Sequence, residues 1–68
     1  MINTKLPQGI CIETETYKFY IHQIYKVAPQ VFIVWITTPT GTRSPIGTAS
    51  NKLRAREMYD AFYLSKNL

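Results

Sequence analysis

The sequence has a single cysteine, few acidic residues and no long apolar run. Because Cys11 is the only cysteine among 68 residues, neither a disulfide within the chain nor a cysteine-based zinc site can form. This usage fits a reducing compartment, so we expect a cytoplasmic location. No run approaches the roughly 20 apolar residues of a membrane span, and the N-terminal stretch lacks the apolar segment of a secretory signal. We expect no membrane partner.

The residue patterns of common catalytic and metal sites are also missing. The four acids, Glu13, Glu15, Glu57 and Asp60, show no pairing by their spacing. The sequence has no Ser/His/Asp grouping, no glycine loop that could cradle a phosphate and no zinc motif. His22 has no Cys, Asp or second His at metal-ligand spacing nearby, so we expect a polar strand residue there. We predict that the protein is not an enzyme and uses no cofactor or metal.

The length limits the chain to one small domain, residues 1–68. A chain of this size buries only about 60% of its unfolded surface. Its hydrophobic share of 46% and aromatic share of 13% are sufficient for one compact core. Residues 1–5 are expected to form a flexible arm, and residues 65–68 a frayed tail.

Alternating apolar and β-branched residues predict several short strands. Residues 10–15 read as one strand and residues 17–27 as a second, with its odd positions forming the apolar face and a bulge near Gln23 and Ile24. Residues 31–38 carry apolar groups on both faces, which is typical of a central strand. Residues 28–30 and 39–42 are turns. Residues 43–47 form a short strand that Pro45 places at a sheet edge.

A helix is predicted after this last strand. Ser50 or Asn51 can cap it. Its apolar stripe consists of Ala55, Met58, Tyr59 and Phe62. The sequence therefore predicts an α+β fold, a three- or four-stranded antiparallel sheet with one C-terminal helix packed on one face. The opposite face is left without a covering helix, which makes it the natural place for function.

The helix can cover either face of the 31–38 strand. If it covers Phe32, Val34 and Ile36, then Ile33 and Trp35 are exposed on the other face. An exposed Trp on a flat sheet indicates a contact surface for DNA or for a protein. In the reverse assignment, Trp35 belongs to the core.

The charge balance favours an anionic partner. The chain has a formal net charge of +4. Arg43, Lys52, Arg54 and Arg56 form a basic group around the helix start, where no acid precedes Glu57. Because a helix N-terminus is itself partly positive, an anion such as a DNA phosphate would relieve this arrangement. Alternatively, these are long solvated side chains balanced by the helix acids.

Residues 34–62, VWITTPTGTRSPIGTASNKLRAREMYDAF, carry a family resemblance. They combine an apolar strand, a Pro/Gly turn with a basic residue, a strand ending in a Gly-Thr pair, and a helix with Ala and Tyr. The matching residues are Pro39, Gly41, Arg43, Ile46, Gly47, Thr48, Ala55, Tyr59, Asp60 and Ala61. The pattern resembles the DNA-binding domain of plant ethylene-response factors and the N-terminal arm-binding domain of phage tyrosine-recombinase integrases. The opening LPQGI is also similar to that of integrase-type members.

This resemblance implies a sheet that lies in the DNA major groove with the helix packed behind it. By position, Arg43 matches a DNA-contacting Arg and Thr48 a phosphate-contacting Thr. Trp35 and Thr37 fall where the ethylene-response members usually place Glu and Arg, and Tyr25 falls where they place Arg. These departures remove bidentate donors of the kind that read bases in the major groove.

Two functions follow as hypotheses. The first is a non-enzymatic module for double-stranded DNA. Its phosphate contacts would be Arg43, Thr48, Lys52, Arg54 and Arg56, and its groove contacts Tyr25, Trp35 and Thr37. The second is a protein-interaction module, either a homodimer or a phage or mobile-element inhibitor of a host system. It would use Tyr25, Ile33 and Trp35.

Overall fold

The computed structural model describes residues 9–67, which form four strands and one helix. The elements are β1 (Ile10–Tyr17), β2 (Tyr20–Ala28), β3 (Val31–Thr37), β4 (Arg43–Ala49) and α1 (Lys52–Ser65). This confirms the predicted α+β class, with the larger of the two expected strand counts. The predicted arm at residues 1–5 and the last tail residue, Leu68, lie outside the described residues.

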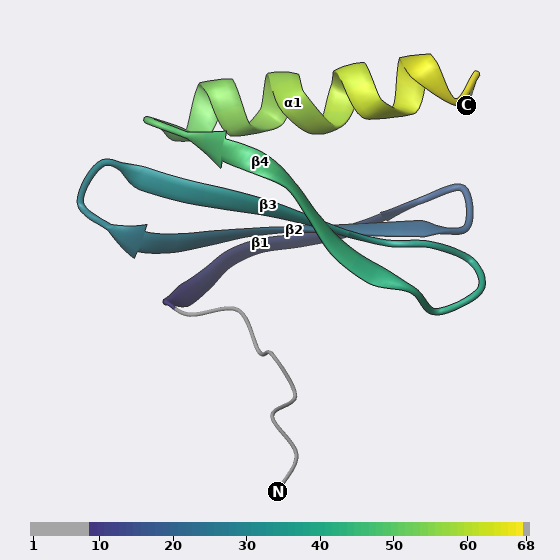
Figure 1. Ribbon diagram of the computed structural model, residues 1–68, viewed down its shortest axis with the longest axis horizontal. Coiled ribbons are helices and arrows are strands. Elements are labelled where there is room, and N and C mark those ends of the chain that lie inside the picture. Colours follow the sequence, from purple (N-terminus) through teal and green to yellow (C-terminus); the bar gives the residue numbers. More distant parts are fainter. Residues whose placement is uncertain (1–8, 68) are drawn as a thin grey trace, which may run out of the picture.

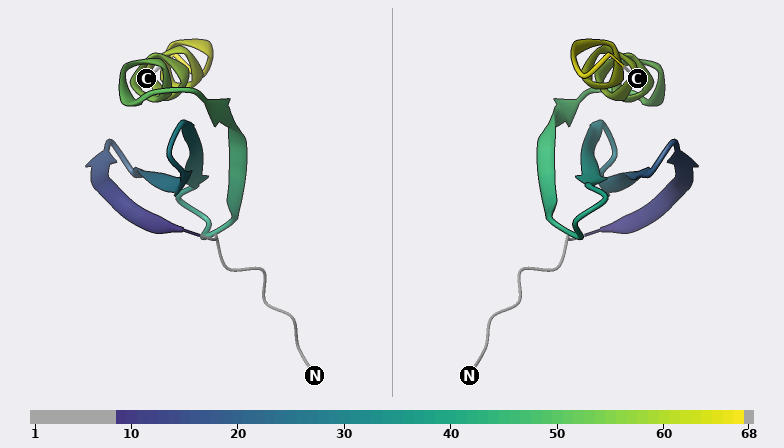
Figure 2. Two further views of the ribbon diagram at one scale, coloured as in Figure 1. Left: turned by 90° about the vertical axis from the view of Figure 1, so that its left-hand side faces the viewer. Right: turned by 90° about the vertical axis from the view of Figure 1, so that its right-hand side faces the viewer.

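The strands form one antiparallel meander in the order β1-β2-β3-β4, with α1 lying across one side of it (Figure 1). The sheet is strongly twisted, so β1 and β4 curve away from the central pair when the molecule is viewed from its ends (Figure 2). No helix in residues 9–67 combines the length and apolarity needed to cross a membrane.

The β1–β2 hairpin differs from the sequence prediction. Residues 17–27 are not one strand, because the chain reverses at Lys18 and Phe19, where Lys18 has a φ of 59°. This turn lacks the Asn-Gly or Asp-Gly pair that signals a tight hairpin. The reversal places the even positions of β2 toward the core and leaves Phe19 80% exposed. The predicted odd apolar face is therefore wrong.

The bulges also lie elsewhere than predicted. No register shift occurs at Gln23 and Ile24; the shifts in this hairpin region fall between Cys11 and Glu13 on β1 and between Lys26 and Ala28 on β2. The central part of β2 is therefore a regular strand whose two faces alternate without interruption.

The second half of the sheet follows the prediction closely. β3 is central, pairing with β2 on one side and β4 on the other. Thr38 N–H donates to Thr42 O at 2.8 Å and Gly41 N–H donates to Thr38 O at 2.9 Å, which closes the predicted turn. β4 is an edge strand, as Pro45 indicated, and it continues to Ala49, two residues beyond the predicted end at Gly47.

The helix begins at one of its two predicted caps. The Asn51 side chain accepts a hydrogen bond from Arg54 N–H at 2.8 Å, which satisfies one free donor of the first turn. α1 continues through Ser65, the first residue of the predicted tail. The Lys66 N–H then bonds back to the carbonyls of Phe62 and Tyr63.

The core lies between α1 and the two central strands. Its buried residues are Ile24, Phe32, Val34, Ile36, Ala55, Tyr59 and Tyr63. The helix therefore covers the Phe32 face of β3. Tyr63, one residue beyond the predicted helix stripe, is also buried, while Met58 and Phe62 pack half-buried at its margins.

The fully buried side chains of the core dominate the stability of so small a domain. Ile24→Ala is expected to lower the free energy of unfolding by about 2–5 kcal/mol, because it leaves a cavity beneath α1. For a chain of this length, the total free energy of unfolding is roughly 3–10 kcal/mol. Leu53→Ala removes a side chain that is 66% exposed and should change stability by less than about 0.5 kcal/mol. Urea denaturation followed by circular dichroism measures both, and equal effects would contradict this account of the core.

Candidate nucleic-acid interface and the histidine cleft

The sheet face opposite α1, hereafter the uncovered face, is not overlain by any strand or helix of residues 9–67. Strand register places its residues in three rows across β2, β3 and β4. The rows are Ile21–Thr37–Arg43, Gln23–Trp35–Pro45 and Tyr25–Ile33–Thr48. Five of the predicted site residues, Tyr25, Trp35, Thr37, Arg43 and Thr48, therefore share one surface with Ile33.

Arg43 lies across the centre of the uncovered face. Its Nη2 donates to Gln23 Oε1 at 2.7 Å and to Tyr25 OH at 3.0 Å. The guanidinium carbon lies 5.3 Å from the centre of the Trp35 ring and 5.8 Å from that of Tyr25. The side chain is exposed, and its Nε and Nη1 donors do not take part in these two hydrogen bonds.

Ile33 and Trp35 are half-buried, although they lie on the uncovered face. They are therefore less exposed than predicted. Neighbouring side chains on a twisted sheet cover one another, and the Arg43 guanidinium lies near the indole ring. The Trp35 Nε1 atom is buried and has no hydrogen-bond partner among the described residues.

Gln23 was missed by the sequence analysis, which treated it as an interruption of the strand. The available signal was its position two residues before Tyr25, because residues two apart on a strand share a face. Its amide lies against Arg43, so the uncovered face carries the two side-chain types that can contact adenine and guanine in a bidentate way.

All four acids of the chain lie on the helix side of the sheet. Glu13 and Glu15 on β1 pair with Ile24 and His22 of β2, whose side chains are buried toward α1. Glu57 and Asp60 belong to α1 itself. The uncovered face therefore has no carboxylate within residues 9–67.

The four cations of the predicted basic group do not form one cluster. Lys52 Nζ and Arg56 Nη2 lie 3.8 Å and 3.3 Å from Glu13 Oε1, at the β1 side of α1. Arg54 lines a separate hollow with Thr48 at the junction of β4 and α1. Arg43 is on the other face of the sheet. One flat surface cannot contact all four.

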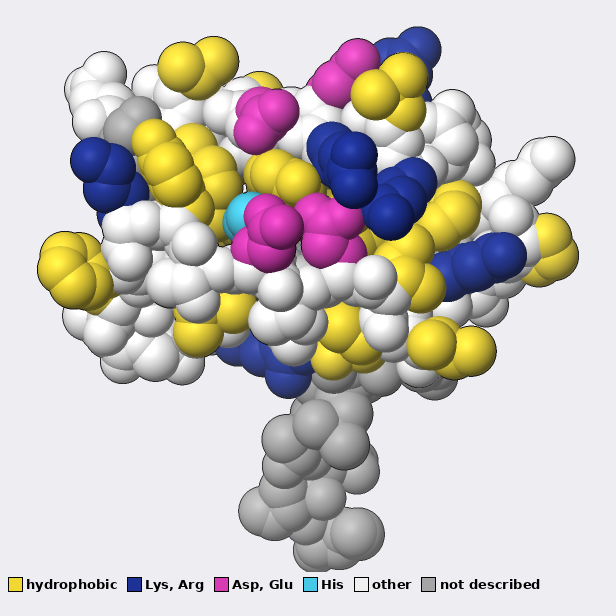
Figure 3. All heavy atoms as spheres, turned by 180° about the vertical axis from the view of Figure 1, so that it is seen from behind, with side chains coloured by type: hydrophobic (Ala, Val, Ile, Leu, Met, Phe, Trp, Pro, Cys, Tyr) yellow, Lys and Arg dark blue, Asp and Glu magenta, His cyan; other side chains and the backbone are white. Residues whose placement is uncertain are grey.

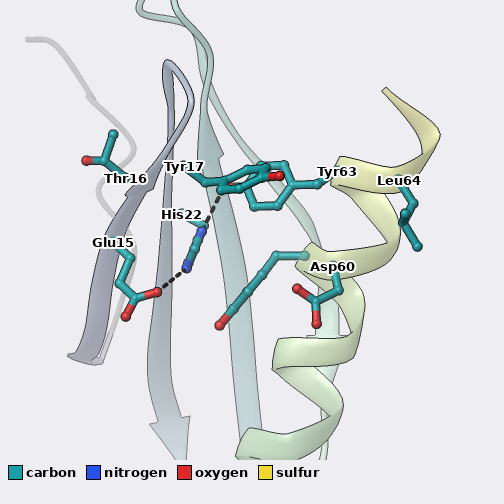
Figure 4. A pocket seen from close by; sticks show the side chains of 8 residues that line it. Glu15, Thr16, Tyr17, His22, Asp60, Tyr63 and Leu64 are labelled. Atoms are coloured by element: carbon teal, nitrogen blue, oxygen red, sulfur yellow. Dashed lines mark hydrogen bonds and ion pairs between the residues drawn. The ribbon is translucent and has the colours of Figure 1, made fainter. Parts of the chain in front are cut away.

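A second polar site lies between β1 and α1 and centres on His22, which is 2% exposed. His22 Nδ1 is 2.7 Å from Tyr63 OH, and its ring stacks on Tyr59 at a centroid distance of 3.7 Å. His22 Nε2 points toward Glu15 (Figure 4), with Glu15 Oε1 at 3.4 Å. His22 is thus a strand residue, as expected, but it lies in the core.

Glu13 connects this site to the helix. Tyr59 OH donates to Glu13 Oε2 at 2.8 Å, and Arg56 donates to Oε1. Burial raises the pKa of Glu13, but the hydrogen bonds from Tyr59 and Arg56, with the nearby charges of Arg56 and Lys52, outweigh it and bring the pKa below its usual value. Glu13 is therefore ionised at neutral pH.

His22 and the two tyrosines beside it, Tyr59 and Tyr63, are uncharged at that pH. Burial lowers the pKa of His22, against the opposing effect of Glu15 and Glu13. Burial also raises the pKa of Tyr63 to about 12, and burial together with the Glu13 hydrogen bond raises that of Tyr59. An uncharged imidazole has one nitrogen with a free lone pair.

These groups border an open cleft of about 540 Å³. Its lining residues are Glu15, Thr16, Tyr17, His22, Tyr59, Asp60, Tyr63 and Leu64. Figure 3 shows the histidine and acidic side chains together on this side of the molecule, with apolar side chains around them and basic side chains close by. We call this the histidine cleft.

No local pattern in the sequence indicates the histidine cleft. Glu15 and His22 lie at equal distances from the turn at Lys18 and Phe19, and they become cross-strand partners only once that turn is placed. One ligand atom from each of Glu13, Glu15 and His22 lies within 4.8 Å of the others, so these are the residues that could hold a metal ion.

Comparison with known proteins found no matching protein family, no matching curated protein and no matching solved structure.

The stability of the protein should fall as the pH falls. The pKa values of Glu13 and His22 are both lowered on folding, so the unfolded chain binds more protons and acid favours it. The His22 contribution is lost as the pH falls below the ordinary pKa of 6.5, and that of Glu13 as the pH falls below 4.5. Glu13→Gln should cost about 1–3 kcal/mol at neutral pH and flatten the acidic part of the profile.

Glu57→Gln provides the matched control, because it removes an exposed carboxylate from the other side of α1. Urea denaturation at several pH values measures the effect. A Glu13→Gln profile that runs parallel to the wild-type profile would contradict the assignment.

Proposed function

We propose that the protein binds double-stranded DNA through the uncovered face and catalyses no reaction. The observation that carries the proposal is the position of Arg43. It is exposed at the centre of the uncovered face, oriented by Gln23 and Tyr25 and lying near the Trp35 ring. A side chain held in this way loses less conformational freedom on binding than a freely rotating one.

The charge distribution supports an anionic partner at this face. The chain carries a net charge of +4, and its four acids lie on the helix side. A phosphate backbone approaching the uncovered face would meet Arg43 and no carboxylate of residues 9–67. The opposite side, where Glu13, Glu15 and Asp60 gather, would repel it.

The side chains on the uncovered face suit a DNA groove. Arg43 can donate to guanine O6 or N7 from Nη1 or Nε, and Gln23 can contact adenine N6 and N7. Tyr25 and Trp35 offer apolar surface to sugars and thymine methyl groups, and Thr37 offers a hydroxyl group. β-sheets and β-ribbons are known to read DNA through their strands.

Phosphate contacts would flank this central area. Thr48 is exposed on β4, and Arg54 lies beside it at the start of α1. Lys52 and Arg56 are placed against Glu13 instead, so the proposal does not include them. The resemblance of residues 34–62 to sheet-type DNA-binding domains supports the same orientation, with the helix behind the sheet. A cytoplasmic location remains part of this proposal.

The runner-up is a protein-interaction module, a homodimer or an inhibitor of a host system of the phage or mobile-element type. The observation that favours it is the central position of Ile33 and Trp35 on the uncovered face, beside Tyr25. Aromatic residues and Arg are common anchors of protein interfaces. Arg43 would then have to be paired or desolvated in the complex, which makes this surface less suited to a purely apolar contact.

DNA affinity should decrease steeply with salt and depend on Arg43. Each neutralised phosphate contributes about −0.9 to the slope of log Kobs against log salt concentration. Arg43→Ala should lower the affinity for duplex DNA by roughly 5- to 150-fold, which corresponds to a loss of about 1–3 kcal/mol. Fluorescence anisotropy with labelled duplexes of mixed sequence measures both quantities.

Lys66→Ala is the matched control, because it removes one positive charge at the far end of α1. It should change the affinity less than two-fold, an estimate that follows from screening over about 10 Å. Absence of binding to any duplex at low salt, or equal losses in the two variants, would reject the DNA proposal.

Self-association tests the runner-up separately. If the chain is a homodimer through the uncovered face, sedimentation should show a dimer that persists at high salt, because apolar contacts are not screened. Trp35→Ala should then yield a monomer, while Arg54→Ala leaves the dimer intact. A monomer at all accessible concentrations excludes the homodimer form of this alternative.

A further inference from the structure

A group of ligand atoms at the edge of the histidine cleft is not used by the DNA proposal. Glu13 and Glu15 come from β1 and His22 from the adjacent β2, and the hairpin register fixes all three on the same side of the sheet. Their ligand atoms lie within 4.8 Å of one another. We propose that these residues bind a divalent transition-metal ion of the zinc type.

The buried imidazole is the first argument. His22 is 2% exposed, and its Nε2 has no hydrogen-bond partner among the described residues. A buried polar atom without a partner carries a desolvation penalty of about 1–3 kcal/mol. Here Nε2 points toward Glu15 (Figure 4), and Glu13 Oε2 lies 3.8 Å from it. A metal ion between these groups would satisfy all three at once.

The distances are the second argument. His22 Nε2 lies 3.4 Å from Glu15 Oε1 and 3.8 Å from Glu13 Oε2. Neighbouring ligand atoms of a tetrahedral site with bonds of about 2.0–2.2 Å are roughly 3.3–3.6 Å apart. Glu15 is 65% exposed at its side chain, so it can adjust to the ion without disturbing the core.

The hydrogen bonds around the ligands are the third argument. Metal-binding histidines normally use their second nitrogen to contact a group that fixes the ring. His22 Nδ1 makes this contact with Tyr63 OH at 2.7 Å. The Tyr59 hydroxyl group donates to Glu13 Oε2, and the Tyr59 ring stacks on the imidazole. The ligands are therefore oriented before any ion arrives.

The surrounding charge determines the strength and kind of binding. Lys52 and Arg56 oppose a cation, but they face Glu13 Oε1, while Oε2 faces His22. Asp60 on α1 borders the cleft and adds a third negative charge. One imidazole with two carboxylates suits Zn²⁺ or Co²⁺ better than Mg²⁺ or Ca²⁺, which take all-oxygen ligand sets. The fourth position opens into the cleft, where a water molecule can bind.

The test titrates Co²⁺ and then Zn²⁺ into the full chain without a histidine tag. Tetrahedral Co²⁺ absorbs visible light more strongly than the hydrated ion, so binding produces a band that Zn²⁺ then removes. We expect one ion per chain, with a Kd below roughly 100 μM, and a rise in Tm with Zn²⁺.

Glu15→Gln is the decisive variant, because Glu15 is exposed and the fold does not depend on it. It should weaken Co²⁺ binding by more than about ten-fold. Tyr63→Phe should weaken it by about 10- to 100-fold through the loss of the Nδ1 contact. Glu57→Gln removes an equal charge outside the cleft and should leave the affinity unchanged.

Three results would overturn the proposal. One is no Co²⁺ band and no Zn²⁺ effect on Tm up to millimolar metal. Another is equal binding by Glu15→Gln and the wild type. The third is an equal loss in Glu15→Gln and Glu57→Gln, which would indicate diffuse charge attraction. His22→Gln is less informative, since its buried position means that the variant can fail to fold.

Discussion

The packing of α1 onto β2 and β3 is the interaction on which the rest of the structure depends. A single helix covers only one face of a sheet, and here Ala55 and Tyr59 lie over Ile24, Val34 and Ile36. Apolar burial of this kind is the main favourable term in a domain this small. Because the helix selects one face, every strand residue is assigned either to the core side or to the uncovered face, and the two surfaces differ in chemistry.

The helix side of the sheet holds a buried histidine and an ionised carboxylate beside the apolar core. His22 is buried beneath two tyrosines, and Glu13 joins β1 to α1 through Tyr59 and Arg56. Buried polar groups destabilise a fold unless their hydrogen bonds are made. Most of these are made here, which ties the edge strand β1 to the helix. His22 Nε2, which has no hydrogen-bond partner among residues 9–67, faces Glu15 at the edge of the histidine cleft.

Much of the architecture could be predicted from local patterns. The run from Val31, the turn at Gly41 and the cap at Asn51 are short-range signals, and each was found where it was expected. The β1–β2 hairpin was not, because its turn at Lys18 and Phe19 has no characteristic residue pair. Because this turn was not predicted, the wrong face of β2 was expected to point toward the core. The same error hid both Gln23 beside Arg43 and Glu15 beside His22, since cross-strand neighbours are known only when the register is known.

The sequence by itself determined the fold class, the helix with two adjacent candidate caps, the central position of β3 and the edge position of β4. These follow from periodicity and turn chemistry within a few neighbouring residues. Tertiary structure alone decided which face α1 covers, that Arg43 bonds to Gln23 and lies near the Trp35 ring, and that Lys52 and Arg56 pair with Glu13 instead of joining Arg43. The physical reason is that these contacts join residues far apart in the chain, and they depend on strand register and helix placement, which no local pattern encodes.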